Sequence, residues 1–145
     1  MNGYDEDNVR AKNTEICKKL MSSFNMETWH DLLHDELVLE FPYASYIGMP
    51  DRVVGKKKCV SYLSNVMKNF SGLEFEDVII NGTEDPNKLI VEYNGNCKTP
   101  TGVSYKQIYA TVQKFKDGKM ILFREFWNPM AITEAFGDNL SSEFA

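Results

Sequence analysis

The hydrophobic pattern changes its period near residue 72, and this change constrains the fold more than any other feature of the sequence. Before that point, apolar residues recur at the i, i+3, i+4 spacing of helices that bury one face. After it, four runs have the composition of strands, and turn-forming residues separate them. A chain that places helices first and strands second is expected to form an α+β fold with an antiparallel sheet.

The pattern predicts each element in turn. In chain order we expect a helix over 5–24, a short helix carrying Trp29, Leu32 and Leu33, a strand over 37–41, a loop over 43–55, a helix from Gly55 to Phe70, strands over 73–80, 88–97, 103–115 and 119–127, and a short tail helix over 129–136. No internal repeat or flexible linker divides the chain, so residues 1–145 are expected to form one domain. Helices on one face of a curved sheet would make a cone with an internal pocket, which small ligands favour.

Composition and charge exclude several classes of protein. Of the 145 residues, 43% are hydrophobic and 26% charged, which is the balance of a soluble globular protein. The net charge of −5 argues against nucleic-acid binding. The basic run Lys56–Lys58 could hold a phosphate or an anionic lipid, but a solvated helix end is the better interpretation. No apolar run approaches the ~20 residues of a membrane span. Residues 1–10 lack the apolar core of a secretory signal, so we expect a cytoplasmic protein.

The sequence predicts no metal site and no cofactor. Cys17, Cys59 and Cys97 are odd in number and lack the spacing of zinc ligands or of a disulfide framework. His30 and His34 have the i, i+4 spacing of a metal-binding pair, but no third ligand is in view, so a solvated helix face is the better interpretation. No glycine-rich loop resembles a dinucleotide site, and no nucleophile set is recognisable.

The dipeptide Asp117-Gly118 predicts the register of the last two strands. Between alternating strands, Asp-Gly is typical of a two-residue type I′ turn. In that register Lys116 lies opposite Lys119, and Glu125 lies opposite Ala110. Directly opposed residues point to the same side of a sheet, so the register also assigns the faces.

One predicted face is apolar apart from a single glutamate, and we expect it to face the core. It consists of Ile108, Ala110, Val112, Phe123, Glu125 and Trp127. The other face is semi-polar and aromatic, which is typical of a protein–protein surface. It consists of Tyr105, Gln107, Tyr109, Thr111, Gln113, Leu122, Arg124 and Phe126.

Glu125 is therefore predicted to be a carboxylate on the core side of the sheet. Burial disfavours the charged form and raises the pKa of a carboxyl group toward neutrality. Such a group suits general acid or base catalysis near pH 7. Structural alternatives stay open: Glu125 reaches solvent at the end of the sheet, it pairs with a lysine, or a bulge turns the faces over.

Collinear motifs resemble the phenazine-biosynthesis condensing proteins. The motifs are Phe70-Ser71-Gly72-Leu73-Glu74-Phe75, Thr83-Glu84-Asp85-Pro86-Asn87 with Val91-Glu92, and Arg124-Glu125-Phe126-Trp127-Asn128-Pro129, where the family typically has Met at the position of Trp127. The likeness extends from about Phe70 to Gly137. The first half, with Trp29, Asp35, Phe41-Pro42 and Gly55, resembles more broadly the SnoaL-like polyketide cyclases and ketosteroid isomerases. The resemblance implies a nuclear-transport-factor-2-like α+β cone that forms a homodimer through its outer sheet face, with one ligand pocket per subunit.

The resemblance also implies roles for residues. In the phenazine group the glutamate matching Glu125 serves as acid and base while two aminoketone-carboxylate molecules condense. The facing helix usually offers His and Ser, where this chain has Tyr62 and Val66. Tyr62 can donate a hydrogen bond but keeps its proton near pH 7, and Val66 cannot donate. This double loss argues against the phenazine reaction itself and leaves the fold and the pocket as expected.

Seven side chains join Glu125 and Tyr62, the candidate catalytic pair, as candidates for binding substrate. They are Trp127, Tyr43, Tyr46, Ile108, Val66, Arg52 and Tyr105. Tyr43 and Tyr46 follow the first strand at the expected pocket mouth, although packing alone would also explain them. Arg52 is the candidate clamp for a substrate carboxylate. Tyr105 matches a pocket position of the phenazine group, although the predicted register turns it outward.

Two functions remain open from the sequence. The first is a cofactor-free isomerase, cyclase or condensing enzyme in which Glu125 moves a proton beside the carbonyl or imine carbon of a cyclic compound, while Tyr62 or a backbone group polarises the oxygen. The second is a dimeric module that holds a small apolar or aromatic molecule unchanged, because one fold can serve many purposes. The single buried acid favours the enzyme, and the lack of a second clear catalytic partner favours the module.

Overall fold

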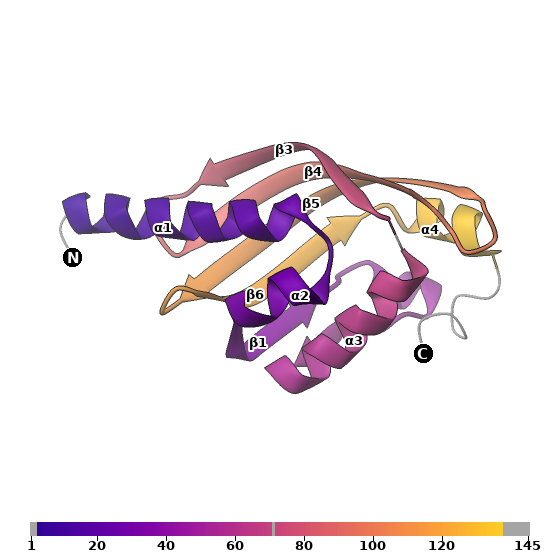
Figure 1. Ribbon diagram of the computed structural model, residues 1–145, viewed down its shortest axis with the longest axis horizontal. Coiled ribbons are helices and arrows are strands. Elements are labelled where there is room, and N and C mark those ends of the chain that lie inside the picture. Colours follow the sequence, from indigo (N-terminus) through magenta and orange to yellow (C-terminus); the bar gives the residue numbers. More distant parts are fainter. Residues whose placement is uncertain (1–2, 71, 138–145) are drawn as a thin grey trace.

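The computed structural model describes residues 3–70 and 72–137, and its fold is α+β, as predicted (Figure 1). In chain order the elements are α1 (Gly3–Ser22), α2 (Met26–Trp29), a 3-10 turn (His30–Leu32), β1 (Leu33–Glu40), a second 3-10 turn (Ala44–Ile47), β2 (Arg52–Val54), α3 (Lys56–Asn69), β3 (Glu74–Gly82), β4 (Lys88–Lys98), β5 (Ser104–Lys116), β6 (Lys119–Trp127) and α4 (Pro129–Phe136). Ser71, which belongs to one of the family-like motifs, lies outside the described residues.

Within the described ranges, six strands form one sheet in the order β2-β1-β6-β5-β4-β3. The four long strands β3 to β6 make an antiparallel meander, which confirms the predicted architecture. β1 returns beside β6 and pairs with it in parallel, while β2 pairs antiparallel with β1 at the sheet edge. The sheet is curved, and α1, α2 and α3 lie along one of its faces (Figure 1). That face is the inner face, and the core lies between it and the helices.

The first half of the sheet differs from the prediction in two places. β1 begins at Leu33 rather than at Leu37, and its register against β6 shifts between Leu33 and Val38. The polar residues inside that irregular stretch hide the strand from pattern analysis. β2 lies in the segment predicted as a loop, because three residues are too few to show an alternating pattern.

Helix α2 begins at a side-chain cap, and a buried tryptophan at its end joins it to α1. The Asn25 side chain caps α2 by accepting a hydrogen bond from the Thr28 backbone N–H at 2.8 Å. The Trp29 indole N–H donates to the Leu20 carbonyl at 2.9 Å, which fixes α2 against the end of α1. No helix in the described part of the chain is both long and apolar enough to cross a membrane.

The β5–β6 hairpin forms at the predicted turn. Asp117 and Gly118 both have positive φ, 53° and 75°, as a type I′ turn requires. Lys116 pairs with Lys119, again as predicted.

The register then changes by one residue on β6. Phe115 pairs with Met120, whereas the preceding residue Lys114 pairs with Leu122. Ile121 is therefore the extra residue of a β-bulge. This is the bulge that the sequence analysis left open as an alternative.

This single residue turns β5 over relative to the prediction, because successive side chains of a strand point to opposite faces. Glu125 lies opposite Thr111, and Trp127 lies opposite Tyr109. The buried inner face of β5 carries Tyr105, Gln107, Tyr109, Thr111 and Gln113, and its outer face carries Ile108, Ala110 and Val112. The predicted faces of β5 are wrong. The predicted inward direction of Phe123, Glu125 and Trp127 on β6 is right.

Candidate functional site

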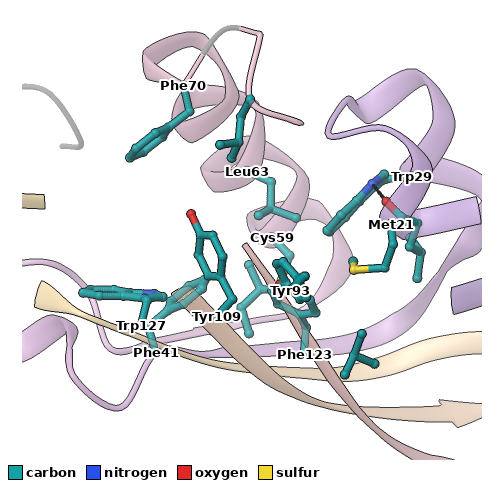
Figure 2. Packing of buried hydrophobic residues seen from close by; sticks show 14 of the residues in the cluster. Met21, Trp29, Phe41, Cys59, Leu63, Phe70, Tyr93, Tyr109, Phe123 and Trp127 are labelled. Atoms are coloured by element: carbon teal, nitrogen blue, oxygen red, sulfur yellow. Dashed lines mark hydrogen bonds between the residues drawn. The ribbon is translucent and has the colours of Figure 1, made fainter. Parts of the chain in front are cut away.

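An apolar cavity lies between α3 and the inner face of the sheet. The centre of a water-sized sphere can move through about 50 Å³ of it, and counted up to the wall atoms and out through its open mouth the space is about 550 Å³. Figure 2 shows Tyr109 and Trp127 on the sheet side, facing Leu63 and Phe70 on the α3 side. The lining residues are Phe24, Phe41, Met49, Tyr62, Leu63, Val66, Phe70, Leu73, Phe75, Tyr105, Tyr109, Phe123, Glu125, Trp127 and Ile132. Such apolar, aromatic concavities are typical of small-molecule sites.

Glu125 supplies the one carboxyl group among the described residues of the cavity wall. Strand β6 places it on the inner face between Phe123 and Trp127. Its side chain is half-buried, and its Oε2 accepts a hydrogen bond from the Tyr93 hydroxyl at 2.8 Å. Burial raises the pKa of Glu125 to about 7, while the hydrogen bond from Tyr93 opposes the increase. The group therefore populates both its acid and its base form near neutral pH.

Tyr93 is held in place by ring stacking. It lies on β4 directly opposite Tyr109, and the two rings stack with centroids 4.9 Å apart. Burial, followed by the charge of Glu125, raises the pKa of Tyr93 well above its ordinary value, so its hydroxyl remains a donor. On the neighbouring strand β5, the Thr111 hydroxyl accepts a hydrogen bond from Gln113 Nε2 at 3.2 Å. Tyr93, held by its stacking on Tyr109, orients the Glu125 carboxyl group through the hydrogen bond that its hydroxyl donates.

The close packing of Tyr109 depends on Gly95 in the neighbouring strand β4. A Cβ atom at Gly95 would lie 2.6 Å from Cε2 of Tyr109 and 3.1 Å from Cδ1 of Leu73. Carbon atoms do not approach that closely, so a side chain at this position would force the Tyr109 ring away. Glycine therefore allows the ring to lie flat over the strand where the cavity needs it.

Three tyrosines line the cavity itself, Tyr62 from α3 and Tyr105 and Tyr109 from β5. Burial, followed by the charge of Glu125, raises the pKa of Tyr62 to about 12, so Tyr62 keeps its proton at neutral pH. The hydroxyls of Tyr105 and Tyr109 lie 3.1 Å apart. Because one of them donates to the other, the pair as a whole retains one hydroxyl hydrogen that it can donate elsewhere.

The structure brings five of the predicted site residues together around the cavity. They are Glu125, Tyr62, Trp127, Val66 and Tyr105. Tyr105 was expected to face outward, and it faces inward because of the bulge at Ile121. The sequence resemblance had placed it in the pocket, where it lies.

The structure places the other four predicted residues away from the cavity lining. Ile108 lies on the outer face with 74% of its surface exposed, so its predicted inward direction is wrong. Tyr43 packs edge-to-face on Phe126 of the outer face, with ring centroids 6.0 Å apart. Tyr46 is exposed, and so is Arg52 on the edge strand β2.

Two residues of the site were missed by the sequence analysis. Tyr109 was assigned to the outer face by the predicted register. Tyr93 carried a usable signal, because Leu89, Val91 and Tyr93 alternate along their strand and are all buried. That alternation would have placed Tyr93 on the inner face without any knowledge of the hairpin.

The histidines and cysteines lie apart from the cavity lining. His30 is 3.2 Å from Asp31, and Nδ1 of His34 accepts a hydrogen bond from the Glu36 backbone N–H at 3.0 Å. In residues 3–70 and 72–137, no three His, Cys, Asp or Glu side chains gather as metal ligands would. The three cysteines are free and buried.

Comparison with known proteins relates most of the chain, from the end of α1 to the first half of β6, to one family. Residues 18–123 match the SnoaL-like domain. The chain is 32% identical over 134 residues to YesE of Bacillus subtilis, with 90% of each chain covered. It is 34% identical to a PhzA/B-like protein of Pseudomonas aeruginosa, covering 82% of this chain and 84% of the other. The solved phenazine biosynthesis-related protein PhzB2 of Pseudomonas aeruginosa superposes with a TM-score of 0.80 at 25% identity, covering 92% of this chain and 90% of that one.

Proposed function

The chain belongs to the SnoaL-like family, and from this premise we propose that it is a cofactor-free acid/base enzyme that uses Glu125 on a cyclic ketone or imine. One observation carries the proposal. A carboxyl group with a pKa of about 7 lies on the wall of an otherwise apolar cavity, and the Tyr93 hydroxyl holds it at 2.8 Å. Carboxyl groups tuned in this way suit proton transfer at neutral pH.

The proposed reaction is a proton transfer through an enol. The ionised form of Glu125 removes a proton from the carbon beside the carbonyl, and the electrons of the broken C–H bond form the enol double bond. The Tyr62 hydroxyl donates a hydrogen bond to the carbonyl oxygen, where negative charge develops. In a β,γ-unsaturated ring ketone, Glu125 then returns its proton to the γ carbon, and the double bond moves into conjugation with the carbonyl. Alternatively, the enolate carbon forms a bond to the carbon of a second carbonyl, whose π bond breaks and whose oxygen takes the proton from Glu125 as the ring closes. The apolar walls strengthen both interactions because they exclude water.

Proton exchange tests this function without knowledge of the natural substrate. We expect the protein to catalyse deuterium uptake beside the carbonyl of a two-ring ketone such as α-tetralone in heavy water, as followed by NMR. Glu125→Gln should lower the rate about 100-fold or more, because the general base is lost. Glu134→Gln, which changes an exposed glutamate on α4, is the matched control and should leave the rate unchanged. Equal exchange by the wild-type protein and Glu125→Gln would overturn the proposal.

The ligand-binding module is supported by a separate observation. The other titratable side chains among the described residues of the cavity wall are tyrosines whose pKa values are raised, so none of them exchanges protons readily at pH 7. Glu125 would then have no partner of matched pKa. In the same experiment, this second function predicts that the ketone binds to the wild-type protein without any exchange.

We also propose that the protein is a homodimer joined through the outer sheet face. The proposal is supported by exposed apolar side chains on that face, with Ile108 at 74% and Ile79 at 54% exposure beside Phe126 and Tyr43. We expect Ile108→Asp to convert a dimer into a monomer in size-exclusion light scattering. Tyr4→Asp, which changes an equally exposed residue on α1, should not. A mass that Ile108→Asp leaves unchanged would contradict this interface.

A cytoplasmic location is part of the same proposal. Its support is the state of the cysteines, since Cys17, Cys59 and Cys97 are all free thiols, which suits a reducing compartment. Cell fractionation tests it, and recovery outside the cytoplasmic fraction would contradict it.

A further inference from the structure

We infer that the ligand of this cavity is an uncharged ring compound that carries a carbonyl or hydroxyl oxygen and no carboxylate or phosphate group. The inference rests on the proposed function, because it names the substrate class of the same site. It is drawn from the composition of the cavity wall.

The described part of the cavity wall has one side chain that can carry a negative charge and none that can carry a positive charge at neutral pH. Among the described lining residues there is one glutamate, and there is no lysine, arginine or histidine. The residues outside the described ranges are Met1, Asn2, Ser71 and the last eight, 138–145, and their sequence contains none of these three residue types either. No side chain of this chain is therefore available to neutralise an anionic ligand in the cavity.

The arginines, the usual partners of carboxylates and phosphates, lie elsewhere. Arg10 on α1 donates to the carbonyl of Thr83 at 3.1 Å. Arg124 points to the outer face and pairs with Glu40 at 2.8 Å. Arg52, the clamp expected from the sequence, is exposed on β2 and does not line the cavity.

A second negative charge would be costly in this cavity for two reasons. A carboxylate that leaves water without a partner loses its hydration without compensation. It would also lie near Glu125, and two carboxylates that share a site cannot readily both be ionised. A bound anion would therefore hold Glu125 in its protonated form and remove the base that the proposed reaction needs.

The same wall carries groups that suit a neutral ring ligand with an oxygen atom. Tyr62 offers a hydroxyl donor from α3, and the Tyr105–Tyr109 pair retains one more on the sheet. Both can donate to a neutral oxygen acceptor. The aromatic faces of Phe70 and Trp127 suit a flat ring. A neutral ring ketone or phenol satisfies these groups without introducing a charge.

A matched ligand series tests the inference on the whole protein. The probes are α-tetralone, the same ketone with a carboxylate on its aromatic ring, and the same ketone with a neutral hydroxymethyl group at that position. Dissociation constants come from ligand-observed NMR at pH 6 and pH 8. We expect both neutral ketones to bind and the carboxylate to bind at least about 100-fold more weakly at pH 8, as expected for an unpaired buried charge. A carboxylate that binds as tightly as the neutral ketones overturns the inference, and so does a panel in which no neutral ketone binds.

A change of wall charge provides an independent test. Val66→Lys introduces a cation on the α3 side of the cavity, and Val66→Met is the neutral control of similar length. We expect Val66→Lys to shift the preference toward the carboxylate by about tenfold or more relative to Val66→Met. If Val66→Lys does not fold, Glu125→Gln replaces it, and the carboxylate should gain affinity relative to the neutral ketone because the like charge is gone. An unchanged preference in the folded variant contradicts the inference.

The two proposals fail in different ways. A protein that binds carboxylates well but still shows Glu125-dependent proton exchange disproves only the inferred ligand class. A protein that prefers neutral ketones but exchanges no proton disproves only the enzymatic function.

Discussion

In the middle of β5, from Gln107 to Gln113, the two faces are the reverse of what a sheet covered by helices on one side usually shows. The buried inner face carries hydroxyl and amide groups, at Thr111 and Gln113 for example, while the outer face carries Ile108, Ala110 and Val112. Hydrogen bonds satisfy part of this polar face, because Gln113 Nε2 donates to Thr111 and the amide of Gln107 bonds to the backbone of Asn128. Gln113 Oε1, in contrast, is buried with no partner among the described residues. A buried face therefore need not be the more apolar one when it surrounds a functional group.

The largest expected effect on stability is seen when aspartate is introduced on the inner face of β5 and compared with aspartate on its outer face. Tyr109→Asp places a charge in the buried stack beside Tyr93, and we expect the free energy of unfolding to fall by about 3–5 kcal/mol. Ile108→Asp, one residue earlier, should cost less than about 1 kcal/mol because Ile108 is 74% exposed. Urea denaturation at low protein concentration measures both. Similar losses for the two variants would contradict the assignment of the faces.

A smaller effect concerns Glu125 and pH. The pKa of Glu125 is about 7 in the folded chain against an ordinary value of 4.5, so the folded state binds more protons between these values. This contribution to stability is fully present below pH 4.5 and is lost as the pH rises through 7. We expect Glu125→Gln to remove this dependence and to be more stable than the wild type at pH 8 by up to about 3 kcal/mol. Parallel pH profiles of unfolding for the two proteins would show that the carboxyl group is not buried as described.

The packing of the inner face can be tested at Gly95. Gly95→Ala forces Tyr109 away from the strand, and we expect a loss of about 2 kcal/mol together with a changed near-ultraviolet circular dichroism spectrum. Gly3→Ala is the control, because no atom lies within 4 Å of a Cβ at Gly3. If Gly95→Ala is as harmless as the control, the Tyr109 ring is not packed on this strand.

The smallest effect is expected at the hydrogen bond that orients the carboxyl group. Tyr93→Phe removes the donor that lowers the pKa of Glu125, so this pKa should rise above that of the wild type. The cost in stability should be about 1 kcal/mol. Carbon-13 NMR titration of the glutamate carboxyl groups measures the pKa. Tyr4→Phe, on the exposed part of α1, should leave it unchanged.

The strand that carries Glu125 could be predicted from its own alternation. Alternate residues of a strand point to the same face, so Glu125 shares its face with Phe123 and Trp127. Two large apolar residues that flank Glu125 on this face indicate that the face is buried. The face of β5 could not be predicted in the same way. Met120, Ile121 and Leu122 are all apolar, so the pattern gives no sign of which residue is the extra one. Only the pairing of the two strands in the structure identifies Ile121 as the extra residue.

The residues of the candidate site could be predicted where they lie on a helix or strand with a regular hydrophobic pattern. The helical stripe that includes Tyr62 and Val66 predicted which side of α3 meets the sheet. The contact between Tyr93 and Glu125 joins residues 32 positions apart and depends on two strand registers, so no local pattern contains it. Tyr46 lies in a short 3-10 turn and Arg52 on the three-residue strand β2, and both elements are too short for a periodicity to fix the direction of a side chain.

The bulge at Ile121 bears on how this chain can be compared with its relatives. A one-residue gap in an alignment of the β5–β6 hairpin leaves the strand pairing intact if it falls at Ile121, because Ile121 has no partner on β5. The side chains from Leu122 to Trp127 then keep their faces. The same gap anywhere between Leu122 and Trp127 would turn part of the strand inside out. In evolution, insertions and deletions in this hairpin are therefore expected to concentrate on the turn side of Leu122, and alignments should be anchored at Glu125 rather than at the turn.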